Sequence, residues 1–116
     1  MNSDRIAEIK AGHKLRNAVL VDQLCAKSVD LSESREIDLH FWAADNVEAD
    51  SLARLLEDSG YASPKVSASV SAPIRWNVEV KIDSSISRVA DDSFAFSLVD
   101  LANGANAEFD GWGTSI

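Results

Sequence analysis

The sequence has 116 residues, 46% of them hydrophobic and 26% charged, and its formal net charge is −8. This length fits one domain over residues 1–116, and the apolar content is too high for a disordered acidic chain. An acidic chain repels phosphate backbones, so the charge argues against direct nucleic-acid binding and favours a basic protein as partner.

The first predicted element is a helix over about residues 4–27. Asn2, Ser3 and Asp4 precede the helical pattern and offer N-cap side chains. Apolar residues then recur at helical spacing at Ile6, Ile9, Val19, Leu20 and Leu24. We therefore expect an amphipathic N-terminal helix ahead of the rest of the domain.

A strand and a second helix follow. Residues 35–42 alternate between apolar and polar side chains, which predicts a strand with one buried face. Asp45 and Glu48 then have the spacing of a capping box, and Gly60 stands where a glycine would end the helix. Residues 45–60 therefore predict the clearest helix of the sequence.

Two further strands are expected before the last helix. Residues 66–71 alternate valine or alanine with serine, and residues 75–83 show the strongest strand alternation in the chain. The short break at Ala72-Pro73 predicts that the two strands form a hairpin.

The remaining pattern predicts a helix over residues 88–103 and a short strand over 107–109. After the first helix, the order of elements is β-α-β-β-α-β, the ferredoxin-like or split βαβ arrangement. We therefore predict an α+β fold in which two helices cover one face of a four-stranded antiparallel sheet, with an extra N-terminal helix. The inward strand residues should pack on Leu52, Leu56, Phe94 and Leu98.

The sequence offers little for catalysis. His13 and His40 lie far apart, and Cys25 is the single cysteine, so neither a nucleophile–base pair nor a zinc site is indicated. We expect no metal, no cofactor and no enzymatic activity, with chemistry through Asp91, Asp92 or His40 as the alternative. One cysteine, no export signal and no membrane-spanning stretch predict a cytoplasmic protein without membrane contact.

Trp42 is the first candidate binding residue. It shares the polar face of its strand with Glu36, Asp38 and His40, beside the polar face of the 75–83 strand, where opposite charges could pair. A tryptophan on a polar face suits a binding anchor. The alternative is that Trp42 covers the end of the sheet beneath the N-terminal helix.

The second candidate feature is the C-terminal segment Asp110-Gly111-Trp112-Gly113. Asp-Gly is a typical turn pair, and the second glycine allows close approach of another backbone. These residues could bind a partner, or Trp112 could pack onto the body of the domain as a C-terminal clasp.

Residues 108–114, Glu-Phe-Asp-Gly-Trp-Gly-Thr, resemble the ending of the ribonuclease E inhibitor family, the bacterial regulator of ribonuclease activity B. Upstream, 36–40 resembles the first strand of that family, and 45–61 resembles its helix ending in Gly-Tyr. The resemblance implies a ferredoxin-like fold and a non-catalytic regulator that binds ribonuclease E and dampens its activity. A small-molecule-binding sensor module is the alternative, with a pocket at the sheet edge.

Overall fold

The computed structural model describes residues 3–69 and 75–114. The four strands are β1 (Ser34–Ala43), β2 (Lys65–Ala68), β3 (Trp76–Ser85) and β4 (Glu108–Thr114). The four helices are α1 (Ser3–Ala26), α2 (Asn46–Asp58), α3 (Ile86–Val89) and α4 (Asp92–Asn103). The predicted N-terminal helix over 4–27 is thus confirmed to within a residue at each end.

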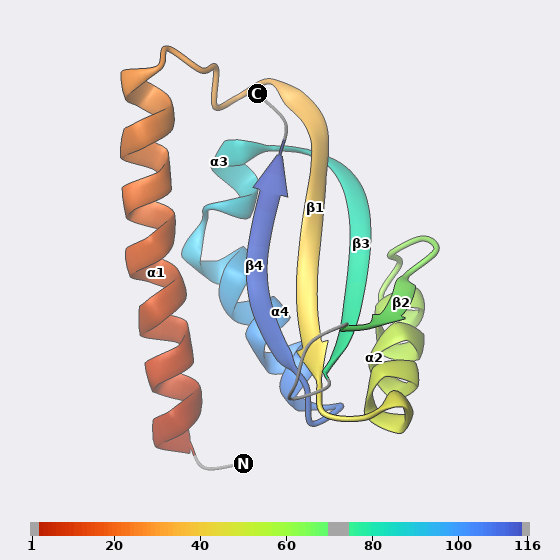
Figure 1. Cartoon of the computed structure of the whole chain (residues 1–116). Coiled ribbons are helices and arrows are strands. Elements are labelled where there is room, and N and C mark those ends of the chain that lie inside the picture. Colours follow the sequence, from red (N-terminus) through yellow and green to blue (C-terminus); the bar gives the residue numbers. More distant parts are fainter. Residues whose placement is uncertain (1–2, 70–74, 115–116) are drawn as a thin grey trace.

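One sheet organises the domain. Its strand order is β2-β3-β1-β4, and all three neighbouring pairs are antiparallel. Figure 1 shows α2, α3 and α4 together on one side of the sheet, while α1 runs along β4. The predicted α+β class and four-stranded antiparallel sheet are therefore confirmed, and the opposite face of the sheet carries no helix among the described residues.

The period-two pattern places the core on the helix side of the sheet. Ile37, Leu39 and Phe41 of β1 are fully buried, as are Val78 and Val80 of β3. Burying such a side chain contributes about 1.5–3 kcal/mol relative to leaving it in water. Of the helix residues predicted to meet these strands, Leu52, Leu56 and Leu98 are buried and Phe94 is half-buried.

Local capping fixes the ends of α2 as the sequence predicted. The Asp45 carboxylate accepts a hydrogen bond from the backbone N–H of Glu48 at 2.8 Å. At the other end, Gly60 has a φ of +98°, a conformation that costs a glycine little, and the Tyr61 N–H closes onto the Leu56 carbonyl at 2.9 Å.

The prediction of one continuous helix over residues 88–103 is wrong. The chain instead forms α3, leaves helical geometry at Asp91, and re-enters it as α4. Asp91 has extended dihedral angles (φ −68°, ψ 135°), and its carboxylate caps α4 by accepting the Ser93 N–H at 2.9 Å. The N-cap preference of aspartate therefore outweighed continuation of the helix.

The predicted turn at Asp110-Gly111 is also wrong. Both residues lie inside β4, which extends to Thr114, well beyond the predicted short strand over 107–109. Phe109 pairs with Phe41 and Gly111 with His40, so Asp110 is an extra residue that forms a β-bulge. Gly111 has a φ of +137°, which only glycine adopts readily.

α1 packs against α4 and runs alongside the outer edge of β4 (Figure 1). Ile6 and Ile9 pack against the core, Leu24 is 5% exposed, and the Lys10 ammonium pairs with Asp100 of α4 at 3.0 Å. Because α1 lies against β4 and the helix layer, the expectation that it covers Trp42 is wrong (Figure 1). Trp42 stays half-buried on the face without helices.

Candidate functional site

His13 joins α1 to the edge of the sheet. The side chain is 3% exposed, and its Nε2 donates to the Phe109 carbonyl of β4 at 2.8 Å. Because a carbonyl can only accept, the proton lies on Nε2, and Nδ1 accepts from the Arg16 guanidinium at 3.0 Å. Burial first, and then the Arg16 charge, lower the pKa of His13 below its ordinary value of 6.5. The imidazole is therefore held neutral.

Asn17 and Trp112 form a second buried link one helical turn further along α1. The Trp112 indole N–H donates to Asn17 Oδ1 at 2.9 Å. The bulge at Asp110 brings Trp112 opposite Leu39, whose side chain is buried, so the indole packs against the core. Asn17 is 5% exposed, and its Nδ2 has no hydrogen-bond partner among the described residues.

A shallow groove of about 110 Å³ runs between α1 and β4. Arg16 and Asn17 line it from the helix, and Asp110, Gly111 and Trp112 line it from the strand. His13, Leu20 and His40 complete the lining. The groove gathers donors from α1 and the exposed Asp110 carboxylate from β4, so it can offer hydrogen bonds to a small polar group.

The uncovered face of the sheet is the second surface. Lys81 lies among three carboxylates, with its ammonium 2.9 Å from Asp38, 3.6 Å from Glu36 and 3.7 Å from Glu79. The hydrogen bond that the Lys81 ammonium donates to Asp38, and then the surrounding negative charges, raise the pKa of Lys81. The predicted pairing of opposite charges across β1 and β3 is confirmed at Asp38–Lys81, and this face remains acidic overall.

Two glycines leave the same face of β4 without side chains. Gly111 lies opposite His40 of β1, and Gly113 lies opposite Asp38. A Cβ on Gly113 would lie 3.9 Å from His40 Nε2, an ordinary contact, so no close packing fills this strip. The backbone of β4 is thus accessible beside the acidic centre of the sheet.

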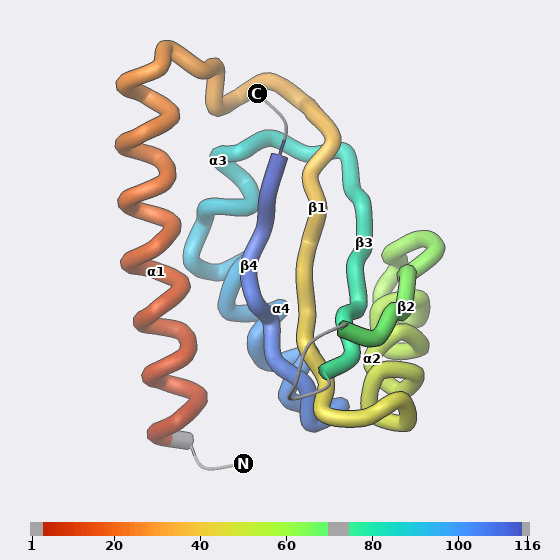
Figure 2. The backbone as a smooth tube through the Cα atoms, in the orientation of Figure 1, coloured from red at the N-terminus to blue at the C-terminus, as the bar shows by residue number. Residues whose placement is uncertain are grey.

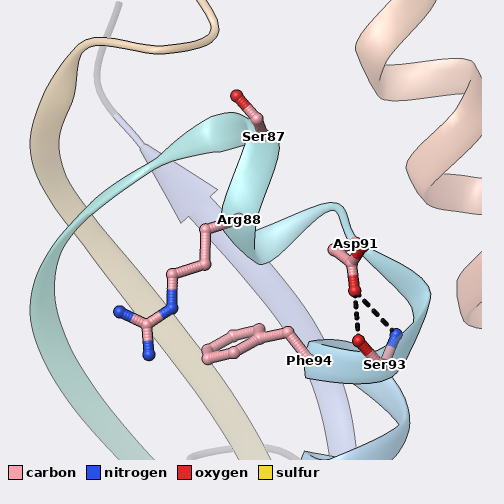
Figure 3. A pocket seen from close by; sticks show the side chains of 5 residues that line it. All are labelled: Ser87, Arg88, Asp91, Ser93 and Phe94. Atoms are coloured by element: carbon pink, nitrogen blue, oxygen red, sulfur yellow. Dashed lines mark hydrogen bonds between the residues drawn. The ribbon is translucent and has the colours of Figure 1, made fainter.

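Figure 3 shows a third feature, an open hollow of about 560 Å³ at the junction of α3 and α4. The Arg88 guanidinium lies over the Phe94 ring, 5.4 Å from its centroid. The Asp91 carboxylate accepts from both the hydroxyl and the backbone N–H of Ser93, and these hydrogen bonds lower its pKa. A carboxyl with a lowered pKa that caps a helix is poorly suited to act as a general acid.

The structure divides the residues predicted to bind a partner. Trp42, Gly111 and Gly113 belong to the uncovered face, whereas Trp112 points to the opposite side and is bound to α1. Asp110 is exposed at the bulge between them. The predicted set therefore contributes to two surfaces that share β4.

Sequence reasoning missed His13, Arg16 and Asn17. Their spacing of three and four residues places them on the side of the helix that carries Ile6 and Ile9, which is a usable signal. Cys25, the single cysteine, is exposed on α1. Across the described residues, no group of three or more histidine, cysteine, aspartate or glutamate side chains could hold a metal ion.

No helix within residues 3–69 and 75–114 is both long enough and apolar enough to cross a membrane. Fold and surfaces together define a small α+β protein with one bare, acidic sheet face. Residues 15–114 match the family RraB, described as Regulator of ribonuclease activity B, and the chain therefore belongs to this family of ribonuclease regulators. No curated protein matches the sequence closely enough to be named as a relative.

Proposed function

We propose that this protein regulates ribonuclease activity by docking directly on the enzyme, without catalysing a reaction itself. The partner is ribonuclease E or another basic protein. The observation that carries this proposal is the acidic, helix-free sheet face in a chain that belongs to a family of ribonuclease regulators.

Charge supports a basic partner. On the uncovered face, Lys65, Lys81 and His40 stand among the carboxylates of Glu36, Asp38, Glu79 and Asp83, so negative charge is in excess. Such an excess of one sign accelerates encounter with an oppositely charged segment and repels nucleic acid. The regulator therefore acts on the enzyme rather than on its RNA substrate.

We assign the binding roles residue by residue. Trp42 supplies the aromatic anchor on the uncovered face, and Gly111 and Gly113 let the partner's backbone approach β4. Asp110 adds a charge at the strand's bulge. Trp112 orients β4 from beneath through its hydrogen bond to Asn17.

For the molecule as a whole, we propose one ferredoxin-like domain over residues 1–116 that acts in the cytoplasm. The order β2-β3-β1-β4 supports this assignment, because β3 lies between the two strands that α2 connects. The N-terminal helix α1 is then an addition that closes the β4 edge.

The test is direct binding of the purified protein to purified ribonuclease E by calorimetry at low and physiological salt. We expect binding that weakens with salt and falls roughly tenfold in the double variant Glu36→Gln/Asp38→Asn, because a buried or close charge pair contributes 1 kcal/mol or more. Asp50→Asn, an exposed change on α2, is the matched control and should leave affinity unchanged. Absence of binding at low salt would refute the proposal.

A second candidate function is that of a small-molecule sensor. The groove at the β4 edge favours it, because Asn17 Nδ2 is buried there without a hydrogen-bond partner in the part of the chain that the structure describes. The groove's volume of about 110 Å³ restricts the ligand to a few heavy atoms. A thermal-shift screen tests this candidate: a stabilising ligand whose effect is lost in Asn17→Leu supports it, and a screen without any stabilisation opposes it.

A further inference from the structure

β3 is longer than the strand that flanks it on its outer side. β1 pairs with β3 along the whole strand, from Trp76 to Ser85. β2 pairs only with the first residues of β3, from Trp76 to Glu79. Figure 2 shows the second half of β3 continuing past β2 with no neighbouring strand on that side. Within the part of the chain that the structure describes, Val80–Ser85 is therefore an open edge whose outward backbone groups can pair with another strand.

At the opposite side of the sheet, α1 runs alongside the outer edge of β4 (Figure 1). There the His13 Nε2–H donates to the outward-facing Phe109 carbonyl at 2.8 Å. The open stretch of β3 is thus a place, beside the short edge strand β2, where this sheet can accept a further strand.

The side chains along this edge are self-complementary. Lys81 and Asp83 point to the uncovered face and are exposed, while Val80, Ile82 and Ser84 point to the core side. If a second β3 pairs antiparallel around a two-fold axis at Ile82, Lys81 of each copy lies directly opposite Asp83 of the other. Directly opposed side chains lie about 4.5–5.5 Å apart at Cβ, close enough for an ion pair.

Asp83 lacks a cation of its own. Asp83 has no ion pair among the described residues. The residue opposite it on β1 is Glu36, which carries the same charge. Like charges directly opposite each other destabilise a sheet. A second copy brings a lysine to this position, and because both charges lie on the uncovered face, pairing does not bury them.

We propose that this edge is a homodimer interface in which the Val80–Ser84 segments of two copies pair antiparallel about Ile82. The two β3 strands then join the two sheets into one continuous sheet, and β2 of each copy stays beside the first residues of its own β3. This inference rests on the open edge of β3 and on its self-complementary charges, and it does not require the proposed ribonuclease partner.

Charge reversal tests the pairing. Sedimentation equilibrium of the wild-type chain, from micromolar to millimolar concentration, should show a monomer–dimer equilibrium. Lys81→Asp and Asp83→Lys should each weaken dimerisation roughly tenfold, because each replaces two attractive pairs with two repulsive ones. The double variant Lys81→Asp/Asp83→Lys should restore it. Asp38→Asn, which removes the intrachain partner of Lys81, is the control and should leave dimerisation intact.

Cross-linking gives an independent readout. In a Cys25→Ser background, Ile82→Cys should form an intermolecular disulfide on mild oxidation, whereas Val47→Cys, exposed on α2, should not. Circular dichroism checks that each variant is folded. A wild-type chain that sediments as a monomer throughout, a double variant that fails to restore the dimer, or equal cross-linking at both cysteines would overturn the proposal.

Discussion

The joint between α1 and β4 and the uncovered face of the sheet use similar polar groups in opposite ways. At the joint, His13 and Asn17 are 3% and 5% exposed, and each forms one hydrogen bond to a residue of β4. On the uncovered face, the Lys81 side chain is 59% exposed and shares its charge among three carboxylates.

This difference separates polar contacts that stabilise the fold from polar groups that are available to bind a partner. A buried group that loses its partner costs about 1–3 kcal/mol, because water cannot replace the hydrogen bond. An exposed ion pair contributes about 0–1 kcal/mol, since water and salt compete for both charges. The joint should therefore govern stability, and the uncovered face should govern association.

The largest effect is expected at the joint. His13→Ala leaves the Phe109 carbonyl without its donor and removes the ring stacked on Phe109 at 4.8 Å between centroids. We expect the free energy of unfolding in urea to fall by about 2–3 kcal/mol. Lys14→Ala, the exposed neighbour on α1, should change it by less than about 0.5 kcal/mol. Equal effects of the two variants would contradict the comparison.

The bulge that aims Trp112 at the joint should be the next most sensitive point. Gly111→Ala forces a side chain into a backbone with a φ of +137°, and we expect a loss of about 1–3 kcal/mol in thermal unfolding. Gly12→Ala is the matched control: Gly12 lies in α1 with nothing within 4 Å of an added Cβ, so this change should stabilise by up to about 1 kcal/mol. The same sign for both changes would argue against the bulge geometry.

Acid should weaken the joint through His13. Its pKa is lowered in the folded protein, so the unfolded chain binds the proton more tightly. The stability that the neutral imidazole contributes is complete above the ordinary pKa of 6.5 and is lost as the pH falls through the lower folded pKa. Urea titrations across this range should show the decline, and His13→Gln should flatten it relative to wild type. An identical pH profile in the two proteins would contradict the assignment.

The smallest effect on stability is expected on the uncovered face. Lys81→Gln removes a cation with three carboxylate neighbours, yet the free energy of unfolding should change by less than about 1 kcal/mol. The same variant should bind a basic partner more tightly at low salt, because it increases the negative charge of the face. A large loss of stability would show that this cluster supports the fold as the joint does.

Much of the scaffold could be predicted because its signals are local. The period of two in β1 and β3 depends only on neighbouring side chains, and so do the caps of α2 at Asp45 and Gly60. The break at Asp91 had a local signal too, an aspartate two residues before a serine, but the helical spacing of Phe94 and Leu98 obscured it.

The candidate site was predicted only in part. The letters of the C-terminal segment singled out Trp112 and its flanking glycines, yet they could not say that Asp110 is an extra residue in the strand. That insertion turns Trp112 toward α1 and leaves the glycines on the opposite face.

The amino-acid sequence alone determined the class of fold, the buried faces of its central strands and the excess of negative charge. The tertiary structure decided which side each residue of β4 faces, which histidine is buried, and which strand edge stays open. The reason is the separation of these contacts along the chain, since His13 and Phe109 are 96 positions apart. Local residue spacing carries no information about a partner that only folding brings close.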